Sequence, residues 1–411
     1  MSLHSAMLLK RFLVDQTWRL SLKSNKFNKK VLPVTAVAVS SLVMAACGSS
    51  ATSSSSSSSG SSSVNYSTCN SLAACGGMSQ LVAAAKKEGV LNVTALPPGW
   101  ANYGEIMSAF KAKYGIKIND INPNGSSAEE INAIKQLKSS TRAPDVIDVG
   151  PAFAQSAAAA GLLAPYKVAT WNDIAANEKA ANGTWYYDYG GYISIGYNAS
   201  AIHVPITGFS SLANPALKGA VALNGNPVGA AAAFNAVYAA ALANGGSFSN
   251  IKPGITYFGN LAKMGVYVPI QSSPAAIESG QIKVNIDWDY LNVAYGKVVA
   301  PKIDWKVIVP KNAQVAGYYA QAISKYAPDP AAARLWEEFL YSNTGQNLWL
   351  KGFARPVRLP QMIAAGTVNK TYLSALPPVS GSPTFPSPSE LSTAETVVAT
   401  DWANAVGNAQ G

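Results

Sequence analysis

The sequence predicts an α/β fold of two lobes. From residue 79 onward, amphipathic helical stretches alternate with short apolar strands, an order typical of a parallel sheet covered by helices. The chain has 411 residues, enough for two domains at about 150 residues each. Hydrophobic residues make up 48% of it and charged residues 13%, so the composition supports a large core and excludes a disordered chain.

Four helices and three strands are predicted in the first part of the folded region. The helix over 103–114 repeats apolar residues at helical spacing and ends at Gly115. Ser127-Ala128-Glu129-Glu130 is a capping box that begins the helix over 128–138. The full set comprises helices over 79–88, 103–114, 128–138 and 152–160, with strands over 90–96, 116–121 and 145–149.

The rest of the chain continues in the same style and ends in a proline-rich tail. We predict strands over 186–197, 221–223, 283–288, 305–309 and 318–324, and helices over 229–242, 253–264, 330–341 and 345–350. Five prolines fall between Pro377 and Pro388, so the tail is expected to form an extended wrap.

Domain boundaries follow from two places where the chain is expected to cross between lobes, near residues 189–197 and 309–319. The predicted segments are a signal peptide (1–46), a Ser-rich tether (47–77), lobe 1 (78–190 and 309–411, including the C-terminal wrap) and lobe 2 (191–308).

The net charge of +10 is concentrated at the N-terminus. Seven basic residues and one acidic residue precede Cys47, so the chain from Cys47 onward carries about +4. This charge is too dilute for a nucleic-acid groove, and no nucleic-acid partner is expected. The basic segment precedes an apolar stretch over 31–46 that is too short to span a membrane comfortably. A basic segment followed by an apolar one predicts a secretory signal.

The signal ends in Met44-Ala45-Ala46-Cys47, which resembles a bacterial lipobox. That resemblance implies a lipidated Cys47 that anchors the protein to the outer face of the cell membrane. Residues 53–63 are serine except for Gly60, a composition that cannot bury a core and predicts a flexible tether. We therefore expect an extracytoplasmic, membrane-anchored monomer.

Two cysteines, Cys69 and Cys75, remain after Cys47. An even number in an oxidising compartment predicts a small disulfide loop, with two reduced thiols as the alternative. A metal site is not expected here, because His203 is the only other soft ligand after the signal.

Several segments, in order, are similar to the extracellular solute-binding proteins of ABC importers, in the branch of ferric-iron, spermidine/putrescine, thiamine and phosphonate binders. The similar segments are 103–117, Ala143-Pro144-Asp145-Val146-Ile147-Asp148-Val149, 160–166 and 328–345. The resemblance spans about residues 79–366 and implies a periplasmic-binding-protein-like fold (type II), whose two α/β lobes close over a solute by a hinge motion. It also implies an ABC permease and a separate ATPase as partners, with no cofactor.

A polyamine is the first ligand that the residues suggest. Asp287 and Asp289 would lie on one side of a strand end and Trp288 on the other, and a buried carboxylate pair requires a cation. Trp100-Ala101-Asn102-Tyr103 resembles the Trp-x-x-Tyr of polyamine binders. Trp100, Tyr103, Asp287, Trp288 and Asp289 are thus candidate ligand-binding residues; a core role for both tryptophans and helix capping by the aspartates is the alternative.

Other ligands stay open. Ferric binders of this family use an adjacent tyrosine pair, and Tyr186-Tyr187 and Tyr318-Tyr319 are such pairs, which makes Tyr319 a further candidate. The turn Asn226-Pro227-Val228-Gly229 leads into a predicted helix, whose first N–H groups could bind phosphate or carboxylate. Thiamine and phosphonate remain alternatives within the same family.

An enzymatic role has little support. The sequence has neither a G-x-S-x-G elbow nor a Walker or G-x-G-x-x-G loop, and a catalytic triad would depend on His203 alone. The remaining enzymatic alternative is a glycoside hydrolase that uses Asp287 and Asp289 as paired carboxylates. We therefore expect a solute receptor without a catalytic step.

Overall fold

The structure is a computed structural model, and it describes residues 64–379 and 385–407. These residues all belong to one compact unit, Ser62–Gly411. The predicted signal peptide, Cys47 and the Ser-rich run over 53–63 lie outside the described residues.

Strand β5 (Tyr186–Asn198) is the centre of the sheet. Among the described residues, eight strands form one mixed sheet with the path β3-β9-β5-β7-β6, and β1 and β2 form a separate parallel pair. The remaining strands are β1 (Val90–Val93), β2 (Lys117–Asp120), β3 (Val146–Val149), β4 (Leu163–Ala164), β6 (Val221–Leu223), β7 (Val284–Trp288), β8 (Trp305–Ile308), β9 (Ala316–Ser324) and β10 (Arg355–Pro356).

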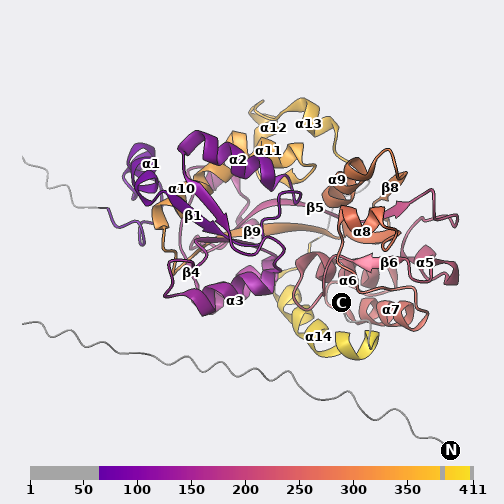
Figure 1. Cartoon of the computed structure of the whole chain (residues 1–411). Helices are drawn as coiled ribbons and strands as arrows, with labels where there is room; N and C mark the ends of the chain where they lie inside the picture. Colours follow the sequence, from indigo (N-terminus) through magenta and orange to yellow (C-terminus); the bar gives the residue numbers. More distant parts are fainter. Residues whose placement is uncertain (1–63, 380–384, 408–411) are drawn as a thin grey trace, which may run out of the picture. The chain divides into compact units, whose positions relative to one another are not determined.

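One strand serves both lobes because β5 changes partners along its length. Residues 186–192 pair with β9 and β10, whereas residues 193–198 pair with β7 and β8. Figure 1 shows β5 and β9 running together between two groups of helices. Gly190 lies directly against the backbone of Gly317, so glycine is required where these two strands meet.

The helices divide between the lobes, with one long helix touching both. Lobe 1 carries α1 (Gly77–Glu88), α2 (Tyr103–Tyr114), α3 (Ser127–Leu137), α4 (Pro151–Ala159), α10 (Pro330–Leu340), α11 (Asn343–Lys351), α12 (Leu359–Ala364) and α13 (Lys370–Ser374). Lobe 2 carries α5 (Phe209–Leu212), α6 (Ala231–Ala243), α7 (Lys252–Lys263), α8 (Pro274–Glu278) and α9 (Asp289–Val299). Helix α14 (Pro388–Val406) packs against α7 of lobe 2 and α4 of lobe 1.

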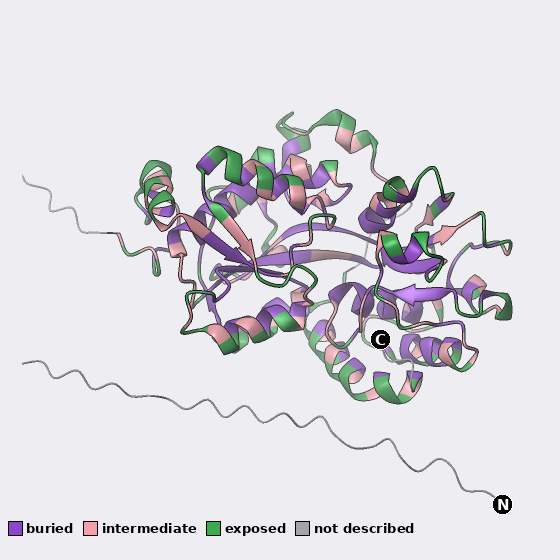
Figure 2. Cartoon of the chain, in the orientation of Figure 1, coloured by how far each residue is buried: buried purple, intermediate pink, exposed green. Residues whose placement is uncertain are grey.

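The core runs through both lobes along the sheet, as the buried colouring in Figure 2 shows. Helix α6 is deeply buried, since every residue from Ala231 to Ala241 is buried. Its sequence is apolar around the whole circumference, which is typical of a helix enclosed by protein. Alanine predominates there, so neighbouring elements can approach α6 closely.

The α/β two-lobe prediction is confirmed, but three details differ. The sheet is mostly antiparallel, with parallel pairing between β1 and β2 and between β6 and β7 in the described residues. The capping box of α3 is formed by Ser126 and Glu129, one residue before the predicted one. The tail predicted as an extended wrap contains α14, because Pro388 occupies the first turn behind the cap Ser387, where proline is tolerated.

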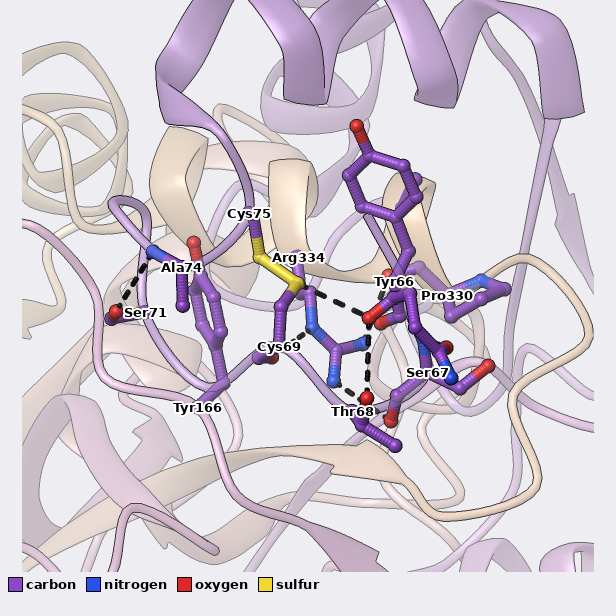
Figure 3. Close-up of a disulfide and its surroundings, with 12 residues drawn as sticks. Tyr66, Ser67, Thr68, Cys69, Ser71, Ala74, Cys75, Tyr166, Pro330 and Arg334 are labelled. Carbon is purple, nitrogen blue, oxygen red and sulfur yellow. Dashed lines mark hydrogen bonds between the residues drawn. A yellow bond between two sulfur atoms is a disulfide. The ribbon is translucent and has the colours of Figure 1, made fainter. Parts of the chain in front are cut away.

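Residues 64–77, predicted to belong to the tether, pack against α10. Cys69 and Cys75 form a disulfide with their Cα atoms 5.3 Å apart (Figure 3). The Arg334 Nε donates to the Cys69 carbonyl at 2.7 Å, and its Nη2 donates to the Ser67 carbonyl at 3.2 Å. Its guanidinium also lies 5.5 Å from the centre of the Tyr166 ring. The chain is therefore held to the fold from this segment onward.

Within the two described ranges, none of the helices has both the length and the apolar character needed to cross a membrane.

The buried carboxyl of Glu337 in α10 is expected to make the stability of the protein depend on pH. Burial raises the pKa of its carboxyl to about 8, helped by the charges of Asp148 and Glu338 and opposed by Arg334. The folded protein then keeps a proton that the unfolded chain releases above about pH 4.5, so stability falls as pH rises from there to 8. Glu337→Gln, which stays neutral, should flatten this dependence and add up to about 4 kcal/mol to the unfolding free energy at pH 8.

Urea unfolding at pH 5 and pH 8 checks this expectation. Glu105→Gln, which changes an exposed carboxyl, is the matched control and should leave the pH dependence unaltered. Equal pH slopes for Glu337→Gln and the unaltered protein would contradict the assignment.

Candidate functional site

A cavity of about 540 Å³ lies between the lobes. The lobe 1 wall comes from the loops that follow β1 and β2, the first turn of α3, and Asp148 of β3. The lobe 2 wall comes from residues 223–232, from residues 267–274 and from α9, and Tyr319 of β9 closes the floor. The cavity therefore lies at strand ends next to the hinge, a common place for ligands in α/β proteins.

The two walls touch at the edge of the cavity. The Ala128 backbone N–H of α3 donates to the Gly229 carbonyl at 3.3 Å. A Cβ atom placed on Gly150 would lie 2.5 Å from the Ala231 Cβ at the start of α6. Lobe 1 thus contacts lobe 2 through small residues, which allow close approach.

The lobe 1 wall is acidic and rests on a buried hydrogen-bond network. Asp148 Oδ2 accepts from the Tyr103 hydroxyl and from the Tyr189 hydroxyl, each at 2.8 Å. The Asp148 backbone N–H donates to Glu130 Oε2 at 3.0 Å. Burial raises the pKa of Asp148 to about 7 and holds that of Glu130 well above its usual range. The charge of Asp148 adds to the effect of burial on the pKa of Glu130. The hydroxyls of Tyr103 and Tyr189 lower the pKa of Asp148, but burial outweighs them.

Aromatic side chains cover the same wall. Trp100 Nε1 donates to the Tyr189 hydroxyl at 2.7 Å. The Tyr319 ring stacks on Tyr189 with centroids 5.7 Å apart, and the edge of Trp100 meets Tyr319 at 5.6 Å. Tyr267 and Tyr295 line the opposite wall. The cavity thus presents aromatic surface beside its carboxyl groups.

The lobe 2 wall offers backbone N–H groups. Helix α6 begins behind Ala230, which has no side chain able to cap the helix, and Ala230, Ala231 and Ala232 all line the cavity. The first N–H groups of a helix have no partner within it and carry a partial positive charge. In contrast, the capping box of α3 is complete, because Glu129 Oε2 accepts from the backbone N–H of Ser126 at 2.8 Å.

Of the residues predicted to bind ligand, Trp100 and Tyr319 line the cavity. Tyr103 is fully buried behind the wall and bonds to Asp148. Asp287, Trp288 and Asp289 are 0%, 1% and 0% exposed and lie behind the lining rather than in it.

The two aspartates satisfy their charges within the protein. Asp289 Oδ2 pairs with Arg355 Nη1 at 2.7 Å, so the cation that the sequence analysis assigned to a ligand is supplied by β10. Asp287 Oδ2 accepts from Asn224 Nδ2 at 2.9 Å and from Asn285 Nδ2 at 3.4 Å. Asn224 lines the cavity, so Asp287 orients a cavity residue instead of facing the cavity itself.

The boundary between β7 and α9 explains why Asp287 and Asp289 do not lie side by side on a strand end, as the sequence analysis expected. Asp289 already belongs to α9, so the alternation that would place it beside Asp287 does not apply. Asp148 and Glu130 were missed, although Asp148 interrupts the otherwise apolar strand Val146–Val149 in a chain with few acids. An acid within a buried strand, one residue before its end, was the signal that could have identified it.

The tyrosine pairs do not converge on one point. Tyr187 and Tyr318 stack on each other with centroids 5.3 Å apart, whereas Tyr319 lines the cavity and Tyr186 packs against Tyr341. Neighbours in a strand point to opposite faces, which separates the members of each pair. In the described part of the chain, no group of three or more His, Cys, Asp or Glu side chains could hold a metal ion.

Comparison with known proteins shows a family and a fold. A model of the bacterial extracellular solute-binding protein family matches residues 141–375. None of the curated proteins matches the chain.

Solved structures share this fold at low sequence identity. Iron-bound HitA from Pseudomonas aeruginosa is 19% identical with a TM-score of 0.59, over 77% of this chain and 99% of that one. AfuA from Actinobacillus pleuropneumoniae, with fructose-6-phosphate bound, is 17% identical with a TM-score of 0.61, over 78% and 98%. A Listeria monocytogenes protein provisionally assigned as a spermidine/putrescine ABC transporter is 12% identical with a TM-score of 0.55, over 76% and 99%.

The absence of a side chain at Gly150 is expected to determine how closely the two lobes can approach. The added methyl of Gly150→Ala would collide with Ala231, and the Gly150 backbone itself, with φ of −59° and ψ of 150°, accepts alanine without strain. The variant should therefore hold the walls apart and increase the radius of gyration in small-angle X-ray scattering. Gly208→Ala, whose new Cβ would have only ordinary contacts from 3.8 Å outward, is the control. Identical scattering from both variants would contradict the contact.

Proposed function

Because the chain belongs to the bacterial extracellular solute-binding proteins, which deliver small solutes to ABC permeases, we propose that it captures a cationic amine in the cavity between its lobes. A polyamine such as spermidine or putrescine is the solute class that this cavity suits best. The proposal contains no catalytic step, in keeping with a family of transport proteins rather than enzymes.

The observation that carries the proposal is the charge of the lining. Three carboxyl residues line the cavity, namely Glu129, Glu130 and Asp148, and the described lining contains no lysine, arginine or histidine. Buried carboxyl groups need a cation or hydrogen-bond donors. An ammonium group supplies both, and its hydrogen bonds to a carboxylate are strengthened by charge.

Aromatic surface and volume support the same class. Trp100, Tyr319 and Tyr295 line the cavity, the first two beside the acidic wall and the third on the opposite wall. Such faces cover methylene groups and attract ammonium groups. A cavity of about 540 Å³ lies within the roughly 300–1,000 Å³ of small-molecule sites.

The candidate residues then divide into two roles. We propose that Trp100 and Tyr319 contact the solute and that Tyr103 holds Asp148 in place. Asp287 would act through Asn224, and Trp288 and Asp289 would fix the strand–helix corner behind the wall.

A second candidate is a solute with a phosphate or carboxylate group. The observation in its favour is the start of α6, where Ala230 cannot cap the helix and the first turn lines the cavity. Helix N-termini of this kind bind anions. A phosphonate belongs to this candidate, whereas thiamine, a cation, belongs with the amines. Ferric iron draws its support from fold neighbours alone, because no tyrosine pair converges.

Three further features complete the proposal. The family implies an extracytoplasmic location, and we propose that Cys47 carries the lipid that anchors a monomer to the membrane. We also propose lobe boundaries at 190/191 and 308/309, which are supported by the nearby change of partners of β5 between Tyr192 and Ile193 and by the end of β8 at Ile308.

A thermal-shift panel tests the solute class. Putrescine and spermidine should raise the melting temperature of the whole protein, whereas 2-aminoethylphosphonate and ferric citrate should not. Trp100→Ala should weaken amine binding about tenfold by removing an aromatic face. Trp171→Ala is the control, because Trp171 is also partly buried but lies outside the lining. A shift with the phosphonate and none with any amine would refute the amine class and favour the second candidate.

A further inference from the structure

A series of four hydrogen-bonded side chains leads from the backbone of β7 to the lobe 2 wall of the cavity. Its members are Ser194 of β5, Asn292 of α9, Asn285 of β7 and Ser272. The first three are 0% exposed and Ser272 is 8% exposed. Of these four, only Ser272 lines the cavity, so the series ends where a solute would enter.

The direction of each hydrogen bond in the series follows from the one before it. A backbone carbonyl can only accept, so the Ser194 hydroxyl donates its proton to the Asp287 carbonyl, 2.9 Å away. Ser194 Oγ can then only accept, and Asn292 Nδ2 donates to it at 2.9 Å. This bond orients the Asn292 amide, whose oxygen accepts from Asn285 Nδ2 at 3.0 Å.

The same reasoning locates the hydroxyl proton of Ser272. Because Asn285 directs its Nδ2 toward Asn292, its Oδ1 faces the other way, where it accepts from the Ser272 hydroxyl. A hydroxyl group has one proton to donate. With that proton on Asn285, Ser272 Oγ can only accept from a further partner. The lobe 2 wall therefore presents a hydrogen-bond acceptor at Ser272.

Asp287 reinforces this arrangement from behind the lining. Its Oδ2 accepts from Asn285 Nδ2 at 3.4 Å and from Asn224 Nδ2 at 2.9 Å. Its Oδ1 accepts from the Trp288 backbone N–H at 2.8 Å. A rotated Asn285 amide would place its oxygen against this carboxylate, so Asp287 is a positioning residue that acts on Ser272 through Asn285. The negative charge of Asp287 also favours a cation over an anion at this wall.

The lobe 1 wall accepts hydrogen bonds as well. Asp148 lines the cavity and is 5% exposed. Its Oδ2 accepts from two tyrosine hydroxyls, whereas its buried Oδ1 has no hydrogen-bond partner among the described residues. A solute between the lobes thus meets acceptors on both walls.

We propose that the solute carries a hydrogen-bond-donating group at each end, as diamines do, with one ammonium group on the acidic wall of lobe 1 and the other donating to Ser272 Oγ on lobe 2. This inference rests on the proposed function and narrows its solute class to amines with two donor ends. The start of α6 on the same wall offers donors instead, so a solute with an amine at one end and an anion at the other is the competing case.

Calorimetric titration of the whole protein with three solutes of equal chain length tests the inference. Burial raises the pKa of Asp287 to about 7, so a pH of 8 keeps this carboxyl group mostly ionised. Putrescine should bind about tenfold more tightly than 1-aminobutane, which lacks the second ammonium group. 4-Aminobutyrate, which places a carboxylate at that end, should bind no more tightly than 1-aminobutane.

Variants separate direct binding from a structural role. Ser272→Ala should weaken putrescine binding about tenfold and leave 1-aminobutane binding unchanged, a difference that a general distortion of the cavity would not produce. Ser272→Thr keeps the hydroxyl group and should retain the preference for putrescine. Ser279→Ala is the matched control, because the Ser279 hydroxyl likewise donates within the protein, to the Ala276 carbonyl at 3.1 Å, but lies outside the lining. It should bind all three solutes as the unaltered protein does.

The possible failures can be told apart on the unaltered protein, so they do not depend on the folding of a variant. Equal affinities for putrescine and 1-aminobutane would overturn the inference and leave the amine receptor standing. Tighter binding of 4-aminobutyrate than of 1-aminobutane would also overturn it and assign this end of the solute to the start of α6. No binding of any amine would overturn the proposed function itself.

Discussion

Strand β5 hydrogen-bonds to both lobes, and the position of the cavity depends on this shared ladder. Its first half pairs with β9 and β10, and its second half pairs with β7 and β8. The same strand carries Tyr189, which lies behind the cavity lining and donates its hydroxyl to the lining residue Asp148. A rotation between the lobes must therefore twist β5 and β9, so the elements that permit movement also hold the buried acids. Cavity chemistry and hinge geometry cannot vary independently here.

The protein compensates its buried acids in three different ways. Asp289 has an ion pair with Arg355, while Asp287 has the side-chain amides of Asn224 and Asn285. Asp148 Oδ2 accepts from two tyrosine hydroxyls, whereas its Oδ1 has no hydrogen-bond partner among the described residues. The first two arrangements are complete without a ligand, and both lie behind the lining. The third leaves one buried carboxyl oxygen without a partner among the described residues, and Asp148 is the one of these three acids that borders the cavity.

Local sequence patterns were sufficient to predict most helices and strands, but not which elements pack or pair with one another. The strand Val221–Leu223 and the helix Tyr103–Tyr114 were predicted at their observed ends, because apolar spacing and a terminal glycine are local. The strand over 283–288 was predicted at its observed end, but helix α9 was considered only in the alternative in which the aspartates cap a helix. Helix α14 was missed because its first proline was taken as a helix breaker instead of a first-turn residue.

The same holds for the cavity residues: those identified by local sequence patterns were predicted, and those that depend on contacts between distant residues were not. Trp100 and Tyr319 were predicted as ligand residues, and both line the cavity. The positions of the aspartates depended on contacts across long stretches of chain, such as that of Asp289 with Arg355, 66 residues away. The hydrogen-bond partners of Asp148 likewise include Tyr103, Tyr189 and Glu130, which no spacing rule connects to it.

The anchoring of residues 64–77 has a mechanical consequence. Arg334 donates hydrogen bonds to the carbonyls of Ser67 and Cys69, and the disulfide between Cys69 and Cys75 closes the short loop that follows them. A pull on the chain at residue 64 is therefore transmitted to α10, which packs against α1, before it reaches β5 or β9. Load applied at this end passes into the body of lobe 1 and leaves the strands between the lobes unstretched.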